Sequence, residues 1–187
     1  MTTTMSHVPT DKPAFSVERS YRSVAVACAT VAGLVHVLVI PEHLRESWLV
    51  GAFFAEVAAA QLVLAWMLRR TTGVATLLVG IWATLGLVAL YVASRTMELA
   101  FLPAHAESAH QVNHLPVAWG VGNGTPIFPH SHIEPVGVPD LVCLVAELGL
   151  VVVLVGLLPA KARRHTTTAM LLGGAAALAL RVSGLMT

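Results

Sequence analysis

The stretch VATLLVGIWATLGLVALYVA, residues 74–93, contains no charged residue. The hydrocarbon core of a bilayer is about 30 Å thick, and a helix of roughly 20 apolar residues crosses it. A run of this length and composition therefore predicts a transmembrane helix. Four further segments carry the same signal, the last of them interrupted by Arg181: residues 23–40, 48–68, 141–160 and 167–185.

The whole chain shares this apolar character. Of its 187 residues, 56% are hydrophobic and 11% are charged, and the mean hydropathy is +0.77. A soluble domain of this size needs more charged residues to cover its exterior. The sequence thus predicts an all-α integral membrane helical bundle of about five spans. Its net charge of +1 provides no broad basic field, which excludes nucleic acid as a partner.

Lysine and arginine in the short loops predict the orientation. With five spans, the basic loop residues concentrate on one side, and such residues favour the cytoplasmic side of a membrane. These residues are Lys12, Arg19, Arg22, Arg69, Arg70, Lys161, Arg163 and Arg164. We therefore expect a cytoplasmic N-terminus, an external C-terminus, a disordered cytoplasmic tail over residues 1–22, and a transmembrane domain over 23–187. The preference for arginine over lysine indicates a GC-rich bacterium and hence a multi-pass protein of the bacterial cytoplasmic (inner) membrane.

An outer loop over residues 94–139 holds five of the nine histidines. A short helix over 104–115 would place one group of metal-binding residue types on one face, namely Glu107, His110 and His114. An extended chain would project a second group to one side, namely His130, His132 and Glu134. Imidazole and carboxylate groups bind Zn²⁺ and Cu²⁺, so the loop predicts a metal site. The alternatives are a solvated interfacial loop and an external pH sensor.

A second candidate site lies deeper in the predicted bundle. Carboxylates within the hydrocarbon are rare and usually face the bundle interior. Glu56 and Glu147 lie at similar depth below the outer surface, with His36 higher and His43 two turns beyond it unless Pro41 breaks the helix. These four residues predict a carboxylate and imidazole metal centre. The alternative is a set of interhelical hydrogen bonds and ion pairs, such as Glu56 or Glu147 with Arg95.

Other polar and sulfur-containing residues have simpler interpretations. Asp140 falls at the predicted start of the fourth helix, where its side chain can cap free N–H groups. Cys28 and Cys143 lie in apolar runs without a CxxC or Cys/His spacing, which favours small packing residues.

Two short motifs carry a resemblance. PEHLRES, within residues 36–62, and EPVGVPD, within residues 134–148, have the form PEHLxES and EPVGxxD. Over its first four predicted spans the chain resembles a group of small, uncharacterised polytopic membrane proteins of GC-rich bacteria. The resemblance implies no activity. It implies only that certain outer-side positions form part of the shared pattern: His36, Glu42, His43, Glu134 and Glu147.

These observations predict a protein that binds a transition metal, copper or zinc, on its extracytoplasmic face, in metal delivery, in sensing or as an accessory subunit. A second hypothesis is a structural subunit of a larger membrane complex that binds no metal. A third is a membrane oxidoreductase with a bis-His haem. No GxxxxGK[ST], GxGxxG, GxSxG or CxxCH motif is present, so the sequence favours a non-enzymatic role.

Overall fold

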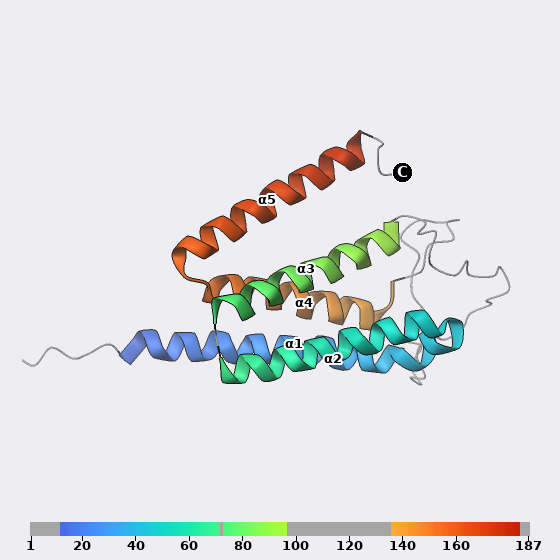
Figure 1. The fold of residues 1–187 in the computed structure, drawn as a ribbon, viewed down its shortest axis with the longest axis horizontal. Helices are drawn as coiled ribbons and strands as arrows, with labels where there is room; N and C mark the ends of the chain where they lie inside the picture. The colour runs from blue at the N-terminus through green and yellow to red at the C-terminus, as the bar shows by residue number, and fades with distance from the viewer. Residues whose placement is uncertain (1–11, 72, 97–135, 184–187) are drawn as a thin grey trace, which may run out of the picture.

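The computed structural model describes residues 12–71, 73–96 and 136–183, and these residues form five α-helices (Figure 1). In chain order they are α1 (Lys12–Glu46), α2 (Trp48–Arg70), α3 (Val74–Thr96), α4 (Val138–Leu157) and α5 (Ala160–Val182). The predicted all-α fold class is confirmed. Helix α1 begins at Lys12, so part of the segment 1–22 that was predicted to be disordered is helical. A search for apolar runs misses such an extension because it detects only the apolar part of a helix.

Four of the described helices are long and apolar enough to cross a membrane. These candidate spans are Val17–Arg45, Trp48–Arg70, Val74–Thr96 and Val138–Leu157. Helix α5 is not among them, because basic residues occupy its first turns and its last turn. The structure therefore supports a multi-pass membrane protein with four candidate spans.

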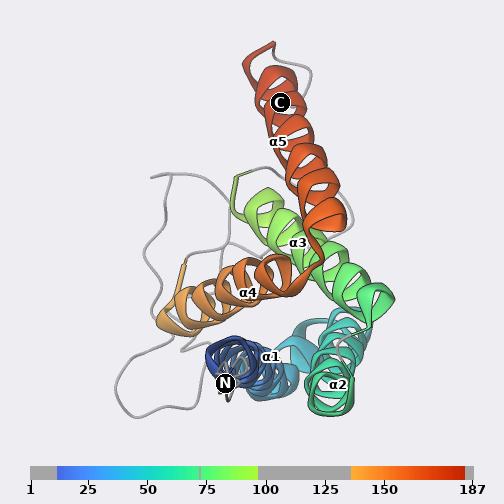
Figure 2. The ribbon, with the colours of Figure 1, turned by 90° about the vertical axis from the view of Figure 1, so that its left-hand side faces the viewer.

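Helices α1 to α4 pack together, whereas α5 diverges from the bundle (Figures 1 and 2). Helix α1 packs against α2 and α4, and α4 also packs against α3. Among the helices described, α5 contacts only α4. Figure 1 shows the start of α1, the end of α2, the start of α3, the end of α4 and the start of α5 at the same end of the molecule. The basic loop residues that the sequence analysis grouped therefore lie at one end.

The connection between α1 and α2 is a single residue, Ser47. Helix α1 continues through Pro41 to Glu46, and Gly51 then lets the start of α2 approach it. A Cβ atom added at Gly51 would lie 2.4 Å from the Leu44 side chain and 2.9 Å from its Cα. The close α1–α2 pairing thus requires a glycine at this position.

The apolar core fills the half of the bundle nearest the basic end. Small residues of α1 meet larger aliphatic residues of α2, α3 and α4, which allows the helices to approach closely. The buried cluster consists of Ala25, Ala29, Ala65, Leu68, Leu77, Ile81, Leu150, Val151, Leu154 and Leu158. The other half of the bundle contains a buried group of polar side chains.

Polar contacts close both ends of the bundle. At the basic end, the Arg22 guanidinium of α1 donates to the backbone carbonyls of Leu68 and Arg69, which lie in the last turn of α2. A cation at this position also interacts favourably with the helix dipole. At the opposite end, Arg95 Nη2 of α3 lies 3.3 Å from Asp140 Oδ1 of α4. These contacts fix the relative heights of neighbouring helices.

Candidate metal centre

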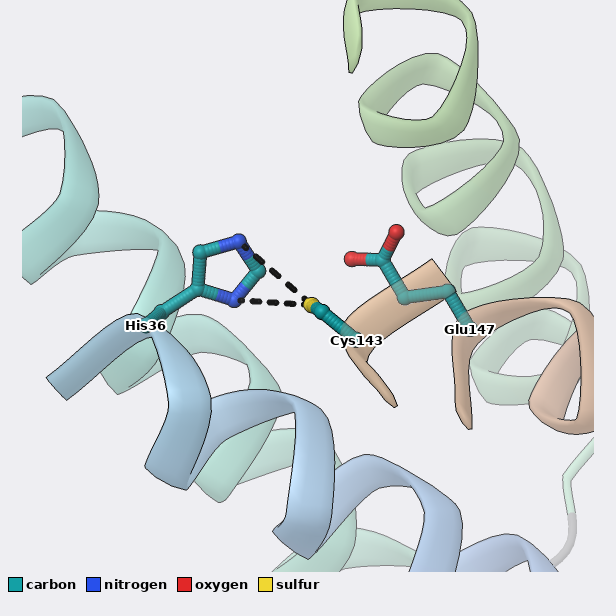
Figure 3. Close-up of side chains that lie close together, drawn as sticks. All are labelled: His36, Cys143 and Glu147. Atoms are coloured by element: carbon teal, nitrogen blue, oxygen red, sulfur yellow. Dashed lines mark hydrogen bonds between the residues drawn. The ribbon is translucent and has the colours of Figure 1, made fainter. Parts of the chain in front are cut away.

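Three side chains with metal-binding atoms meet between α1 and α4. His36 comes from α1, and Cys143 and Glu147 lie one turn apart on the same face of α4 (Figure 3). One nitrogen of His36, the Cys143 sulfur and one Glu147 oxygen all lie within 4.8 Å of one another. Figure 3 shows the imidazole ring directed across the helix interface towards the sulfur. This arrangement brings three different classes of metal ligand to one point.

Within the candidate spans, Cys143 and Glu147 are buried and His36 is half-buried. The exposed fraction is 3% for Glu147 and 8% for Cys143. Glu147 is the tenth of the twenty residues of α4. A buried polar group must find a hydrogen bond or an ion, because the surrounding apolar medium offers no water.

Gln61 of α2 supplies the hydrogen bonds that hold this cluster. Its Nε2 donates to Glu147 Oε1 at 2.8 Å, and its Oε1 lies 2.9 Å from His36 Nδ1. The same Nδ1 lies 3.0 Å from the backbone carbonyl oxygen of Ala32. Gln61 is 4% exposed. Helices α1, α2 and α4 are thus joined by one chain of polar contacts.

These contacts determine which nitrogen of His36 is available. Both partners of Nδ1 are acceptors, so Nδ1 carries the proton and donates it. In a neutral imidazole the Nε2 lone pair is then available to a metal, with the Nδ1–H fixed by outer partners. Nε2 lies 3.9 Å from the Cys143 sulfur. Ligand bonds of the usual lengths for zinc would place a nitrogen and a sulfur about 3.5 Å apart, so a shift of a few tenths of an ångström would complete the pair.

The structure brings together only part of the predicted deeper site. His36 and Glu147 meet, but His43 stacks on Phe54 with ring centroids 4.2 Å apart. Phe54 also stacks on His36, at 5.7 Å, and so lies between the two histidines. The side chain of Glu56 is exposed. The position of Glu56 in the sequence predicts its depth in the membrane but not the direction in which its side chain points. Gln61 lies five positions further along the chain, so the two side chains point about 140° apart around the helix axis.

Sequence reasoning missed Cys143, which is a member of the cluster, and Gln61, which contacts two of its members. The apolar run around Cys143 favours a packing residue, and the sequence pattern predicts no ligand role for Gln61. The available signal for Cys143 was its spacing of four from Glu147, which places the two on one helix face.

Arg95 pairs with Asp140 rather than with either predicted carboxylate. Asp140 also accepts a hydrogen bond from the Gly137 backbone N–H at 2.7 Å, which confirms its predicted capping role at the start of α4. Arg95 additionally lies over the Tyr91 ring, 5.0 Å from its centroid. The interhelical ion pair foreseen for Glu56 or Glu147 therefore belongs to another part of the bundle.

The predicted ligands of the outer loop lie outside the described residues. They are Glu107, His110, His114, His130, His132 and Glu134. Within the described ranges, no second histidine lies opposite His36 to give a haem its axial pair.

No protein family, no curated protein and no solved structure matches this chain. The resemblance carried by PEHLRES and EPVGVPD stays a prediction.

Proposed function

We propose that this protein is an integral membrane protein that binds a divalent transition metal, zinc or copper, between α1 and α4. The observation that supports the proposal is the convergence of His36, Cys143 and Glu147, whose ligand atoms lie within 4.8 Å of one another inside candidate spans. Imidazole, thiolate and carboxylate are each ordinary ligands of Zn²⁺, and imidazole and thiolate also bind copper.

Charge balance favours a divalent ion. A Cys143 thiolate and a Glu147 carboxylate together carry two negative charges, and a neutral His36 adds none. A divalent cation makes the buried site neutral, whereas Cu⁺ leaves one net negative charge in a medium of low dielectric constant. Zn²⁺ and Cu²⁺ satisfy this condition equally.

Three protein ligands leave a fourth position for water, a substrate or a passing ligand. Closed sites with four protein ligands are typical of structural zinc, whereas an open position is typical of sites that exchange or react. This favours metal delivery or sensing over a purely structural ion. The structure supports no particular reaction, so we propose no enzymatic step.

The proposed topology places the site in the outer half of the membrane. Under the positive-inside rule the basic end of the bundle is cytoplasmic, and the cluster lies towards the opposite end. Five spans, with α5 as the last, would put the C-terminus outside. The histidine-rich loop would then lie on the outer side, nearer to the site than the cytoplasmic end is, in the cytoplasmic membrane of a bacterium.

The experiment that tests the proposal is metal analysis of the purified full-length protein without a polyhistidine tag. After zinc loading and removal of excess metal, the wild type should retain about one ion per chain, and Cys143→Ala should lose it. Cys28→Ala is the matched control, because Cys28 lies on α1 outside the cluster. Cobalt loading should give a thiolate charge-transfer band that Cys143→Ala abolishes and Cys28→Ala keeps.

A second variant separates the buried site from the outer loop. Changing His110, His114, His130 and His132 together to Ala should leave the buried ion in place. If this variant loses the metal and Cys143→Ala retains it, the metal site lies in the outer loop and not in the buried cluster. No bound metal in the loaded wild type would overturn the proposal altogether.

One observation favours a second candidate, a subunit of a larger membrane complex. Helix α5 contacts only α4 among the described helices and exposes large aliphatic side chains, with Leu171 74% and Val182 79% exposed. This candidate predicts that a partner copurifies in mild detergent and is lost when Leu171 and Leu172 are changed to Ser, with metal content unchanged.

A further inference from the structure

A groove with a volume of about 650 Å³ lies on the first turns of α5, at the basic end of the bundle. Its lining residues are all exposed, and they are Ala160, Lys161, Arg164, His165 and Thr168. They occupy positions i, i+1, i+4, i+5 and i+8, which form one face of a helix. This α5 groove therefore gathers a lysine, an arginine and a histidine on a single helix face.

The α5 groove faces away from the bundle. On the other side of α5, Ala162 and Met170 pack against the apolar core, and Thr166 between them is 5% exposed. Thr168 follows Thr166 by two positions, which is about 200° around the helix axis. Figure 2 shows α5 leading away from the other four helices. The groove is thus open to the surroundings of the protein.

The cationic side chains of the α5 groove have no acidic partner on the helices that form this part of the molecule. Within the described ranges, no ion pair or hydrogen bond involves the side chain of Lys161, Arg164 or His165. Helix α5 contains no acidic residue, and the half of α4 that follows Glu147 contains none either. Because α4 is the one described helix that contacts α5, the positive charge of the groove is complementary to an anion.

The same face of α5 continues as an aliphatic strip. Leu171 follows Arg164 by seven positions, and Leu172 lies next to it, so both extend the face that carries the groove. Leu171 is 74% exposed and Leu172 67%, and Val182, further along the strip, is 79% exposed. From Leu171 to Val182 the helix rises about 16 Å, close to the roughly 15 Å of hydrocarbon in one leaflet. A molecule with an anionic head and apolar chains matches both parts of this face.

The α5 groove also lies at the height of a membrane surface. The candidate span of α4 ends at Leu157, three residues before the groove begins. The last turn of α2, another candidate span, carries Arg69 and Arg70 at the same end of the molecule (Figure 1). Basic residues at the end of a span lie near the lipid headgroups, and basic pockets at this height bind anionic headgroups.

We propose that the α5 groove binds the headgroup phosphate of an anionic phospholipid, whose acyl chains lie along the aliphatic strip. Lys161 and Arg164 contact the phosphate oxygens, and the Thr168 hydroxyl offers a further hydrogen bond. Leu171 and Leu172 contact the chains. A zwitterionic phospholipid brings a cation of its own next to these side chains, so it binds less tightly. The lipid site is separate from the proposed metal centre, which lies towards the other end of the bundle.

The test is native mass spectrometry of the full-length protein in detergent, titrated with phosphatidylglycerol and, separately, with phosphatidylcholine that has the same acyl chains. The wild type should bind one phosphatidylglycerol with a dissociation constant about 10-fold below that for phosphatidylcholine. Inorganic phosphate at the same concentration should not displace the bound lipid, because it lacks the chains. Equal affinity for the two lipids, absence of a lipid adduct, or displacement by inorganic phosphate would overturn the proposal.

A matched pair of double variants locates the site. Lys161→Gln with Arg164→Gln should weaken the binding of phosphatidylglycerol by at least about 10-fold. Arg69→Gln with Arg163→Gln removes the same charge from exposed positions outside the α5 groove and should leave this affinity unchanged. Circular dichroism checks that both double variants stay helical. Equal weakening by the two pairs contradicts the proposal, and so does a copurifying protein that occupies this face of α5 in place of the lipid.

Discussion

Removing the amide of Gln61 should destabilise the bundle more than the loss of its two hydrogen bonds alone. Gln61→Leu deletes the contacts to His36 and Glu147, at 2.9 and 2.8 Å. Interhelical hydrogen bonds in membranes contribute about 0.6 kcal/mol each on average, so the direct loss is about 1.2 kcal/mol. The Glu147 oxygen, in a side chain that is 3% exposed, also loses its donor, which adds about 1–3 kcal/mol. The expected loss in the free energy of unfolding is therefore about 2–4 kcal/mol.

A double-mutant cycle distinguishes this mechanism from simple loss of packing. Glu147→Leu alone removes the acceptor and leaves the Gln61 amide without it, whereas the double variant removes both groups. The double variant should be less destabilised than the sum of the single variants by at least about 1 kcal/mol. The assay is reversible unfolding in mixed micelles, followed by circular dichroism with a chelator present. Ala60→Leu, on the outward face of α2, serves as the control. Single effects that add within about 0.5 kcal/mol would refute the hydrogen-bonded network.

Three further predictions use the same unfolding assay. Gly51→Ala should destabilise the protein by about 1–3 kcal/mol, because its Cβ meets Leu44, whereas Gly86→Ala, with open space around it, should be neutral or stabilising. Equal effects of the two glycine variants would contradict the close approach of α1 and α2. Arg22→Met should cost about 1 kcal/mol through loss of the cap on α2, and Arg22→Lys should recover part of it; an unchanged midpoint for Arg22→Met would exclude this cap. Asp140→Ala should cost about 2 kcal/mol because it removes both the ion pair to α3 and the helix cap, and a loss below about 0.5 kcal/mol would show that neither contributes.

The helices were predictable from the sequence because membrane insertion depends on local composition. Residues 74–93 contain no charged residue, and α3 contains them all. Residues 48–68 are apolar apart from two polar residues, Glu56 and Gln61, and α2 contains them all. Composition does not set the ends of a helix outside the membrane, and α1 accordingly begins at Lys12, well before the predicted span.

Which residues form the candidate site was less predictable, because the lipid and the protein interior are both apolar. In a soluble helix the polar face identifies the solvent side, but a transmembrane helix has no such contrast. Depth along a helix can be counted from its ends, and Glu56 and Glu147 were correctly expected within their helices. The direction in which each side chain points around the helix axis does not follow from its position along the helix.

The sequence by itself determined that the chain forms apolar helices, because twenty consecutive apolar residues have one favourable environment in a bilayer. Only the tertiary structure decided which side chains meet. It turned Gln61 and Cys143 inward to His36 and Glu147, and turned Glu56 outward. The physical reason is that small residues such as Gly51 let helices approach at particular positions, and this close packing sets the rotation of each helix.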